Sequence, residues 1–276
     1  MPQIRCLSVI AITVVSLLAG IVEGGASSSK QSLFAPFSPE KCDNPPYRTQ
    51  IISKNPLVIY IANFLTDKEM KHVQEVAKDD FLRSKVAEDD GTSTLAQSRT
   101  SQSAVLTRDD TIRCIEDRAL TFQGFDTKRE HLECIQLVKY GTGEKYNAHT
   151  DWFEAELQKT SEMGGNRETS FFAYVAASNI TGGGTNFPLL EVPRDEKWCE
   201  YIDCDEPWEN GVTFRPIPGS AVFWQNIRED GSGDTSTLHA GLPVTSGLKI
   251  GMNIWTRQWP MNPEHNADYE DEDDEE

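Results

Sequence analysis

The chain has 276 residues, which fits one domain of about 200 residues with terminal extensions and excludes two large domains. Hydrophobic residues make up 38% and charged residues 25% of the chain, a composition that excludes collagen-like, coiled-coil and fully disordered proteins. Because 44 acidic residues stand against 26 basic ones, the net charge of -18 repels phosphate backbones, and we expect no nucleic-acid partner.

Residues 1–26 have the pattern of a secretory signal peptide. An apolar run from Cys6 to Val22 follows one early cation, and small residues at 24–26 offer a cleavage site. An uncleaved signal anchor stays open, although the run is shorter than the ~20 residues that usually span a membrane. Both interpretations place the protein in the endoplasmic reticulum lumen or the secretory pathway, and only the anchor implies membrane contact. There, the sequon at Asn179 is a candidate glycosylation site whose occupancy stays open.

Residues 27–55 are rich in Ser, Pro and Lys, so we expect a linker, with the folded domain over residues 56–258. The domain begins with an expected strand over residues 57–64. Thr66 and Glu69 then form a capping box that opens a helix. The apolar face of this helix is expected to hold Met70, Val73, Val76, Ala77 and Phe81. Helical spacing predicts a second helix, ending at Gly124, from Ile112, Ile115, Ala119 and Leu120.

From residue 133 onward, short runs rich in β-branched and aromatic residues alternate with glycine and proline clusters. This pattern predicts a mainly β fold, an antiparallel sandwich or barrel with the two helices packed on one side. The glycines at 182–184 separate two strands, so we expect a tight turn there rather than a phosphate-binding loop. The expected strands span residues 134–140, 170–176, 212–217, 220–225 and 248–257.

Residues 259–276 are expected to form an acidic disordered tail. Eight of the nine residues from 268 to 276 are carboxylates, and such a block repels itself and buries no apolar surface. Removing these eight charges changes the net charge from -18 to -10, so nearly half of the imbalance says nothing about the fold.

The cysteines suggest disulfides rather than a zinc site. Loss of Cys6 with a signal peptide would leave five cysteines, an odd number for an oxidising lumen. We expect a bond between Cys199 and Cys204, which enclose a short acidic loop. A bond between Cys114 and Cys134, with Cys42 left free, stays open. Zinc is disfavoured because no CxxC or HxxxH spacing occurs near these cysteines.

The candidate chemistry centres on His149 and Asp151. In a strand, residues two apart point to the same face, so these two side chains can bind one metal ion together. Alone, such a pair is a weak signal, because many surface histidines lie near an aspartate. His239 is the candidate third ligand. Two imidazoles and one carboxylate leave three adjacent octahedral positions open, which is typical of non-haem Fe(II) oxygenases.

Lys249 lies ten residues after His239, between apolar residues of an expected strand. A lysine buried there needs a counter-charge. An internal salt bridge would supply one, and so would a dicarboxylate cosubstrate whose far carboxylate the lysine holds. Both interpretations stay open from the residues alone.

Residues 56–258 resemble the catalytic domain of the prolyl 4-hydroxylase α-subunit family, within the Fe(II)/2-oxoglutarate dioxygenases. Several motifs of the family occur in order and at its spacing. Tyr140 and Tyr146 lie nine and three residues before His149. The pair of His149 and Asp151 comes next, followed by His239 and then Lys249. The further matching segments are Arg99–Ser101, Gly183–Pro188, Pro218–Trp224 and Gly247–Trp255. The resemblance implies a double-stranded β-helix, or jelly-roll, core with flanking helices.

The resemblance also implies a role for each matching residue. His149, Asp151 and His239 would be the catalytic iron ligands. Lys249 would bind the C5 carboxylate of 2-oxoglutarate with help from the hydroxyl of Tyr140. Three further residues match positions that contact the substrate proline and its peptide: Tyr146, Arg167 and Trp255. Two alternatives stay open: Trp255 could be an aromatic residue of the core, and Arg167 could be a solvated cation in a loop.

The resemblance implies Fe(II) and L-ascorbate as cofactors and 2-oxoglutarate and O2 as cosubstrates. The implied partners are a Pro-rich peptide or protein substrate and a protein disulfide isomerase-like protein. The expected activity is peptidyl-proline 4-hydroxylation in the secretory pathway. Substrates in polyproline II form suit aromatic contacts such as Tyr146 and Trp152. Short Pro-containing secretory proteins or cell-wall glycoproteins are expected rather than collagen. Two alternatives stay open. One is a sister dioxygenase that acts on another side chain or a small molecule, and the other is a non-catalytic secretory binding module.

Overall fold

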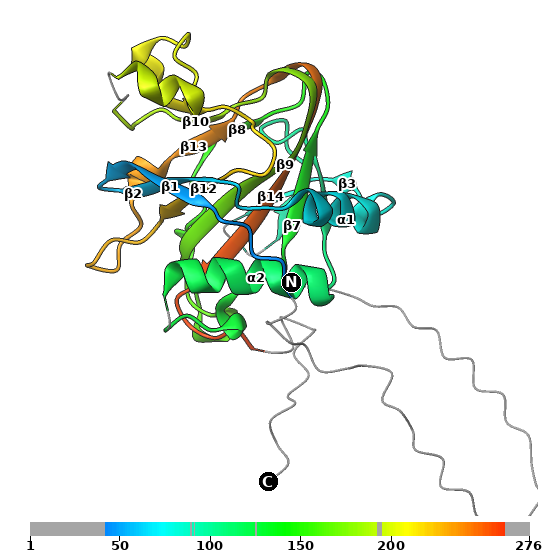
Figure 1. Cartoon of the computed structure of the whole chain (residues 1–276). Helices are drawn as coiled ribbons and strands as arrows, with labels where there is room; N and C mark the ends of the chain where they lie inside the picture. Colours follow the sequence, from blue (N-terminus) through cyan, green and yellow to red (C-terminus); the bar gives the residue numbers. More distant parts are fainter. Residues whose placement is uncertain (1–41, 89, 91, 125, 192–194, 263–276) are drawn as a thin grey trace, which may run out of the picture.

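Two antiparallel sheets face each other in the computed structural model, which describes residues 42–262 except 89, 91, 125 and 192–194 (Figure 1). In spatial order, the larger sheet contains β1 (Arg48–Lys54), β2 (Leu57–Ala62), β12 (Ala221–Gln225), β9 (Arg167–Gly182), β14 (Val244–Arg257), β7 (Gln136–Tyr140), β6 (Gln102–Val105) and β3 (Leu82–Arg83). The smaller sheet contains β11 (Val212–Phe214), β10 (Thr185–Phe187), β13 (His239–Gly241) and β8 (Tyr146–His149). A separate pair is formed by β4 (Val86–Ala87) and β5 (Ser93–Thr94). This is the expected jelly-roll core.

Strand β9 explains how one sheet holds two cores. Phe171, Ala173 and Val175 belong to an apolar cluster on the helix side, whereas Phe172 and Tyr174 belong to a second cluster shared with the smaller sheet. Successive side chains of a strand point to opposite faces, so an uninterrupted apolar run is buried on both faces. The space between the two sheets is therefore lined by side chains of both, and the candidate site lies there.

The helices α1 (Asp67–Ala77) and α2 (Asp110–Gln123) pack on the other face of the larger sheet. The predicted capping box of Thr66 and Glu69 is present, and α2 ends at Gly124 as expected. The predicted apolar face of α1 is wrong at two positions, because Val76 is 43% exposed and Phe81 lies beyond the helix end. Short 3-10 turns make up the remaining helices: η2 (Arg129–His131), η3 (Glu156–Gln158), η4 (Ser161–Met163), η5 (Glu196–Glu200), η6 (Trp208–Asn210) and η7 (Thr235–Thr237).

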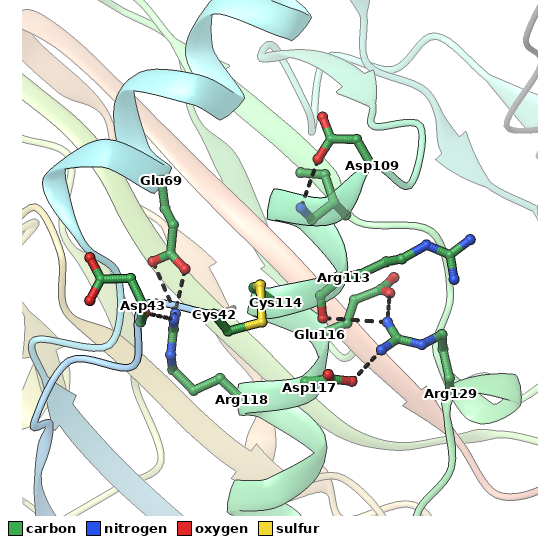
Figure 2. The surroundings of a disulfide bond; sticks show 11 residues. Cys42, Asp43, Glu69, Asp109, Arg113, Cys114, Glu116, Asp117, Arg118 and Arg129 are labelled. Carbon is green, nitrogen blue, oxygen red and sulfur yellow. Dashed lines mark hydrogen bonds and ion pairs between the residues drawn. A yellow bond between two sulfur atoms is a disulfide. The ribbon is translucent and has the colours of Figure 1, made fainter. Parts of the chain in front are cut away.

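A disulfide between Cys42 and Cys114 attaches the start of the described chain to α2 (Figure 2). The alternative of Cys114 with Cys134 is therefore wrong, whereas the expected bond between Cys199 and Cys204 is confirmed. Spacing in the sequence does not decide which cysteines meet, and Cys42 lies 72 residues from its partner. The bond is possible because the segment before β1 packs against α2 instead of being free of the domain.

Buried charges reinforce the same junction. Arg118 of α2 donates two hydrogen bonds to Glu69 of α1, at 2.7 and 3.0 Å, and a third to the carbonyl of Asp43 (Figure 2). Glu116 and Asp117 of α2 form ion pairs with Arg129 of η2. These contacts give the charges their counter-charges and link α2 to α1, to the segment before β1 and to η2.

The domain boundaries differ from the predicted ones. Residues 48–54, assigned to the linker, form β1 and pair with β2, because a strand next to an existing edge satisfies backbone groups even when its side chains are polar. Trp259 and Met261, assigned to the tail, hydrogen-bond through their backbone to Gly164 and Glu130. The predicted signal peptide (residues 1–26), residues 27–41 and residues 263–276 lie outside the described residues. Within the described part, no helix is both long and apolar enough to cross a membrane.

Replacing Thr66 by Ala should lower the free energy of unfolding by about 1 kcal/mol, because the first turn of α1 loses its side-chain cap. Thr66→Ser keeps the hydroxyl and should retain most of the stability. Urea unfolding of both variants measures the difference. Equal unfolding midpoints for Thr66→Ala and the unmodified protein would show that the cap contributes nothing.

Candidate active site

Two histidines from neighbouring strands face each other between the sheets. In the antiparallel pair of β8 and β13, His149 lies opposite His239, and their ring centroids are 4.3 Å apart. One ligand atom from each histidine and one carboxylate oxygen of Asp151 lie within 4.8 Å of one another. The structure therefore brings together the three predicted metal ligands.

Backbone carbonyls orient both imidazoles. The Nδ1 of His149 lies 2.8 Å from the carbonyl oxygen of Asn147, and the Nδ1 of His239 lies 2.9 Å from that of Thr237. A carbonyl only accepts, so Nδ1 carries the hydrogen and the lone pair of the neutral ring is on Nε2. Both Nε2 atoms then point toward Asp151, at 3.8 Å from its Oδ1. Such partners of the other ring nitrogen are typical of metal-binding histidines.

Asp151 is held by its second oxygen. Its Oδ2 accepts hydrogen bonds from the hydroxyl of Ser170 at 2.7 Å and from the indole Nε1 of Trp255 at 3.0 Å. These donors come from β9 and β14 of the larger sheet, so the carboxylate bridges the two sheets. Asp151 lies just after the end of β8 rather than within the predicted strand. Its Oδ1 remains directed at the two imidazoles.

The surroundings keep His149 and Asp151 in the protonation state that binds a metal. Burial, followed by the neighbouring His239, lowers the pKa of His149, so this ring stays neutral. Burial alone would raise the pKa of Asp151, but the two imidazoles and Arg167 lower it below its usual range. The neutral imidazole of His149 and the ionised carboxylate of Asp151 therefore coexist at neutral pH.

Aromatic rings enclose the histidines. Phe187 stacks on His239 with centroids 5.4 Å apart, and Trp224 meets the same ring nearly edge-on at 4.7 Å. On the other side, Tyr146 stacks on His149 at 3.6 Å. The guanidinium of Arg99 lies 4.7 Å from the Tyr146 ring. The ligand rings are thus fixed by packing as well as by hydrogen bonds.

The donor set fits Fe(II). Two imidazole nitrogens and one carboxylate oxygen on one side of a common point are the ligands of non-haem Fe(II) oxygenases, and they leave room for further ligands. His149, Asp151 and His239 would hold the ion. A closed structural zinc site would need a fourth protein ligand, and no further His, Cys, Asp or Glu of the described residues joins this group.

Lys249 lies inside the same space, with 0% of its surface exposed. Its Nζ donates to the carbonyl of Gly183 at 2.6 Å and lies 4.5 Å from the ring centroid of Tyr140. Burial lowers the pKa of Lys249 to about 7, and among the described residues no carboxylate forms an ion pair with it. The salt-bridge interpretation therefore fails, and a buried cation remains that an anionic ligand would neutralise.

The turn before β10 brings the Gly183 carbonyl to this lysine. Gly182 and Gly183 both have φ near +70°, which confirms the predicted tight turn. A side chain at Gly182 would lie 2.5 Å from the carbonyl oxygen of Pro243, so only glycine fits. Beside the lysine, burial raises the pKa of Tyr140 to about 12. Its hydroxyl therefore stays protonated and can donate a hydrogen bond to an anion.

The three predicted substrate residues lie near the ligands, but two of them are engaged within the protein. Arg167 forms a two-pronged pair with Glu133 and stacks over Trp255, 3.6 Å from its ring centroid. Trp255 in turn donates to Asp151. The loop-cation interpretation of Arg167 is wrong, because this residue begins β9 and its side chain is only 13% exposed.

Sequence reasoning missed the residues that orient the ligands. Ser170 is the one small polar residue at the start of an otherwise apolar run, which was an available signal for a buried partner. Glu133 gave no signal, since its partners follow 34 and more residues later. The carbonyls of Asn147 and Thr237 act through backbone geometry, which residue types do not reveal.

Comparison with known proteins agrees with this geometry. The family model described as "2OG-Fe(II) oxygenase superfamily" matches residues 135–257. Two relatives from Arabidopsis thaliana are each 32% identical: probable prolyl 4-hydroxylase 4 over 76% of this chain and 70% of its own length, and prolyl 4-hydroxylase 2 over 79% and 72%. A solved structure of the viral collagen prolyl hydroxylase from Paramecium Bursaria Chlorella virus-1, a complex with 2OG, has a TM-score of 0.51 at 22% identity, covering 79% of this chain and 98% of that one. At that identity, the likeness supports the fold.

The fold and the three-ligand site, together with these matches, define a 2-oxoglutarate- and Fe(II)-dependent dioxygenase. Within that class, the chain belongs to the prolyl 4-hydroxylase family, as the curated relatives show. The predicted family and enzyme class are confirmed.

His239→Ala should abolish tight metal binding, since one of three donors is lost. The loss should exceed the roughly 10- to 100-fold that removing an outer partner of a ligand costs. Anaerobic calorimetric titration with Co(II) measures it. His72→Ala is the matched control. This imidazole pairs with Asp109 between the helices, so its loss should leave Co(II) affinity unchanged. Tight Co(II) binding by His239→Ala would disprove the ligand assignment.

The affinity for 2-oxoglutarate should fall as the pH rises above about 7. Burial disfavours the charged form of Lys249, so the empty pocket loses this proton near pH 7, whereas a bound carboxylate needs the protonated amine. Affinity should be level just below that pH and then weaken by up to about tenfold per pH unit.

Calorimetry of the Co(II)-loaded protein in two buffers of different ionisation enthalpy should show uptake of up to about one proton above pH 7. Lys249→Met should bind 2-oxoglutarate more weakly at every pH and without this dependence. An affinity that is the same at pH 6.5 and about pH 9 in the unmodified protein would contradict the role of the lysine.

Proposed function

We propose that this protein hydroxylates peptidyl proline at the 4-position. The observation that carries the proposal is the aromatic ring of Tyr146, which lies directly on the ligand His149 and so offers an apolar contact beside the metal. The relatives named as prolyl 4-hydroxylases support the choice of proline over other side chains. The buried cation Lys249 supports 2-oxoglutarate as the cosubstrate.

Each residue has a separate task in the proposed reaction. Iron(II) with 2-oxoglutarate and O2 supplies the oxidising chemistry, in which the oxo acid loses CO2 to become succinate while one oxygen atom enters a C–H bond. Lys249 holds the far carboxylate of the oxo acid, and the protonated hydroxyl of Tyr140 donates to it. Burial of both residues excludes water and strengthens these contacts.

The substrate would be a Pro-rich peptide in extended form. A polyproline II segment has little conformational entropy to lose, so aromatic faces bind it at low cost. Tyr146 and Trp152 are half-buried and close to the ligands in the chain, and the Trp152 indole is fixed by a hydrogen bond to the carbonyl of Asp234. Trp255 would contact the proline ring through the indole ring that also stacks on Arg167.

The proposed setting is the secretory pathway. Two disulfides in the described chain suit an oxidising lumen. Asn179 is exposed, as a glycan acceptor must be. We further propose that L-ascorbate keeps the iron reduced and that a protein disulfide isomerase-like partner assists the chain. Both proposals rest on membership of the prolyl 4-hydroxylase family.

Incubation of the protein with Fe(II), 2-oxoglutarate, ascorbate and a panel of Pro-rich peptides tests the function. We expect succinate release together with one added oxygen on proline, located at the 4-position by mass spectrometry and amino-acid analysis of the product. A parallel panel with lysine in place of proline is the control. Succinate release stimulated only by the lysine peptides or by small molecules would support the sister dioxygenase instead.

A further inference from the structure

A buried carboxylate lies between two arginines close to the iron ligands. The two oxygens of Glu133 accept hydrogen bonds from Nε and one terminal nitrogen of Arg167, at 2.7 and 2.8 Å. The Nε of Arg257 lies 2.6 Å from the first of these oxygens. Arg257 is fixed by donating to the carbonyl of Gly165 at 2.7 Å. A two-pronged pair of this kind fixes the plane of the guanidinium as well as its position.

This plane lies on an indole ring that touches a metal ligand. The guanidinium carbon of Arg167 is 3.6 Å from the ring centroid of Trp255. The Nε1 of Trp255 donates to the Oδ2 of Asp151 at 3.0 Å. The backbone N–H of Glu133 also donates to the carbonyl of Trp255, at 3.0 Å. Glu133 is therefore linked to Trp255 in two ways. Its backbone N–H bonds to Trp255 directly, and its side chain pairs with Arg167, which lies on the indole ring.

We propose that Glu133 is a positioning residue for the metal. It clamps Arg167 flat against Trp255, so that the indole N–H keeps Oδ2 of Asp151 occupied and leaves Oδ1 directed at the ion. Arg167 and Arg257 both face the ring of Phe153, at 4.8 and 4.9 Å, so the cluster is packed on that side as well. Without the carboxylate, two buried arginines would repel each other, and the stack on Trp255 would loosen.

The clamp persists over the working range of pH. Burial alone would raise the pKa of Glu133, but Arg167 and Arg257 lower it to about 2. The carboxylate is therefore ionised at neutral pH. The clamp contributes by fixing the orientation of Asp151, as the outer hydrogen-bond partners of metal ligands usually do.

A double-mutant cycle on metal affinity tests the proposal. Trp255→Phe keeps an aromatic ring under Arg167 and removes only the N–H, and it should weaken anaerobic Co(II) binding by about tenfold. Glu133→Gln should weaken it by roughly three- to tenfold. Since both changes act through one hydrogen bond, the double variant should bind no more than about twofold more weakly than Trp255→Phe alone.

Glu69→Gln is the matched control. Glu69 is also a buried carboxylate with two bonds from one arginine, Arg118, but it lies on α1, on the helix side of the larger sheet. Its replacement should lower the unfolding free energy and leave Co(II) affinity unchanged. If Glu133→Gln does not fold, Arg167→Lys, which loses the two-pronged geometry but keeps the charge, takes its place in the cycle.

Two results would overturn the proposal. One is a Co(II) affinity of Glu133→Gln, or of its substitute Arg167→Lys, equal to that of the unmodified protein. The other is a double variant whose loss of affinity equals the product of the two single losses, because independent effects would mean that Glu133 does not act through Trp255.

Discussion

The metal site depends on hydrogen bonds that occupy the outer atoms of its three ligands. Two backbone carbonyls hold Nδ1 of His149 and His239, and two side-chain donors hold Oδ2 of Asp151. Each ligand is left with one lone-pair atom, and these three atoms converge. Without such partners, a buried imidazole could rotate and a carboxylate could turn its other oxygen inward. The fold thus prepares the metal site before any ion arrives.

The jelly-roll makes this arrangement possible because the ligands and their partners come from different sheets. β8 and β13 of the smaller sheet carry the histidines, while β9 and β14 of the larger sheet carry Ser170 and Trp255. The same enclosed space leaves Lys249 without a carboxylate partner in the described chain. In a protein with a net charge of -18, that buried cation stands out as a place for an anionic cosubstrate.

The sequence revealed the elements whose signal is local. The capping box at Thr66 and the end of α2 at Gly124 follow from neighbouring residues, and the apolar runs of β9 and β14 follow from composition. The ligand residues followed from residue type and family spacing. Polar β1 could not be found from its sequence, because pairing with β2 rather than side-chain pattern makes it a strand.

Long-range partners could not be predicted for a related reason. Cys42 bonds to Cys114 across 72 residues, and Trp255 donates to Asp151 across 104. Residue types at such separations do not indicate which side chains meet, since only the folded chain brings them together. Arg167 was expected at the substrate, and its pairing with Glu133 became visible only from the packing.

An anaerobic titration that follows visible absorption tests the central claim most directly. Fe(II) chelated by the carboxylate and keto oxygens of an oxo acid absorbs visible light, whereas the separate components do not. Convergence of the three ligand atoms predicts that this band appears when one equivalent each of Fe(II) and 2-oxoglutarate has been added to the protein. Binding of both components without the band would show that the oxo acid does not reach the ion held by His149, Asp151 and His239.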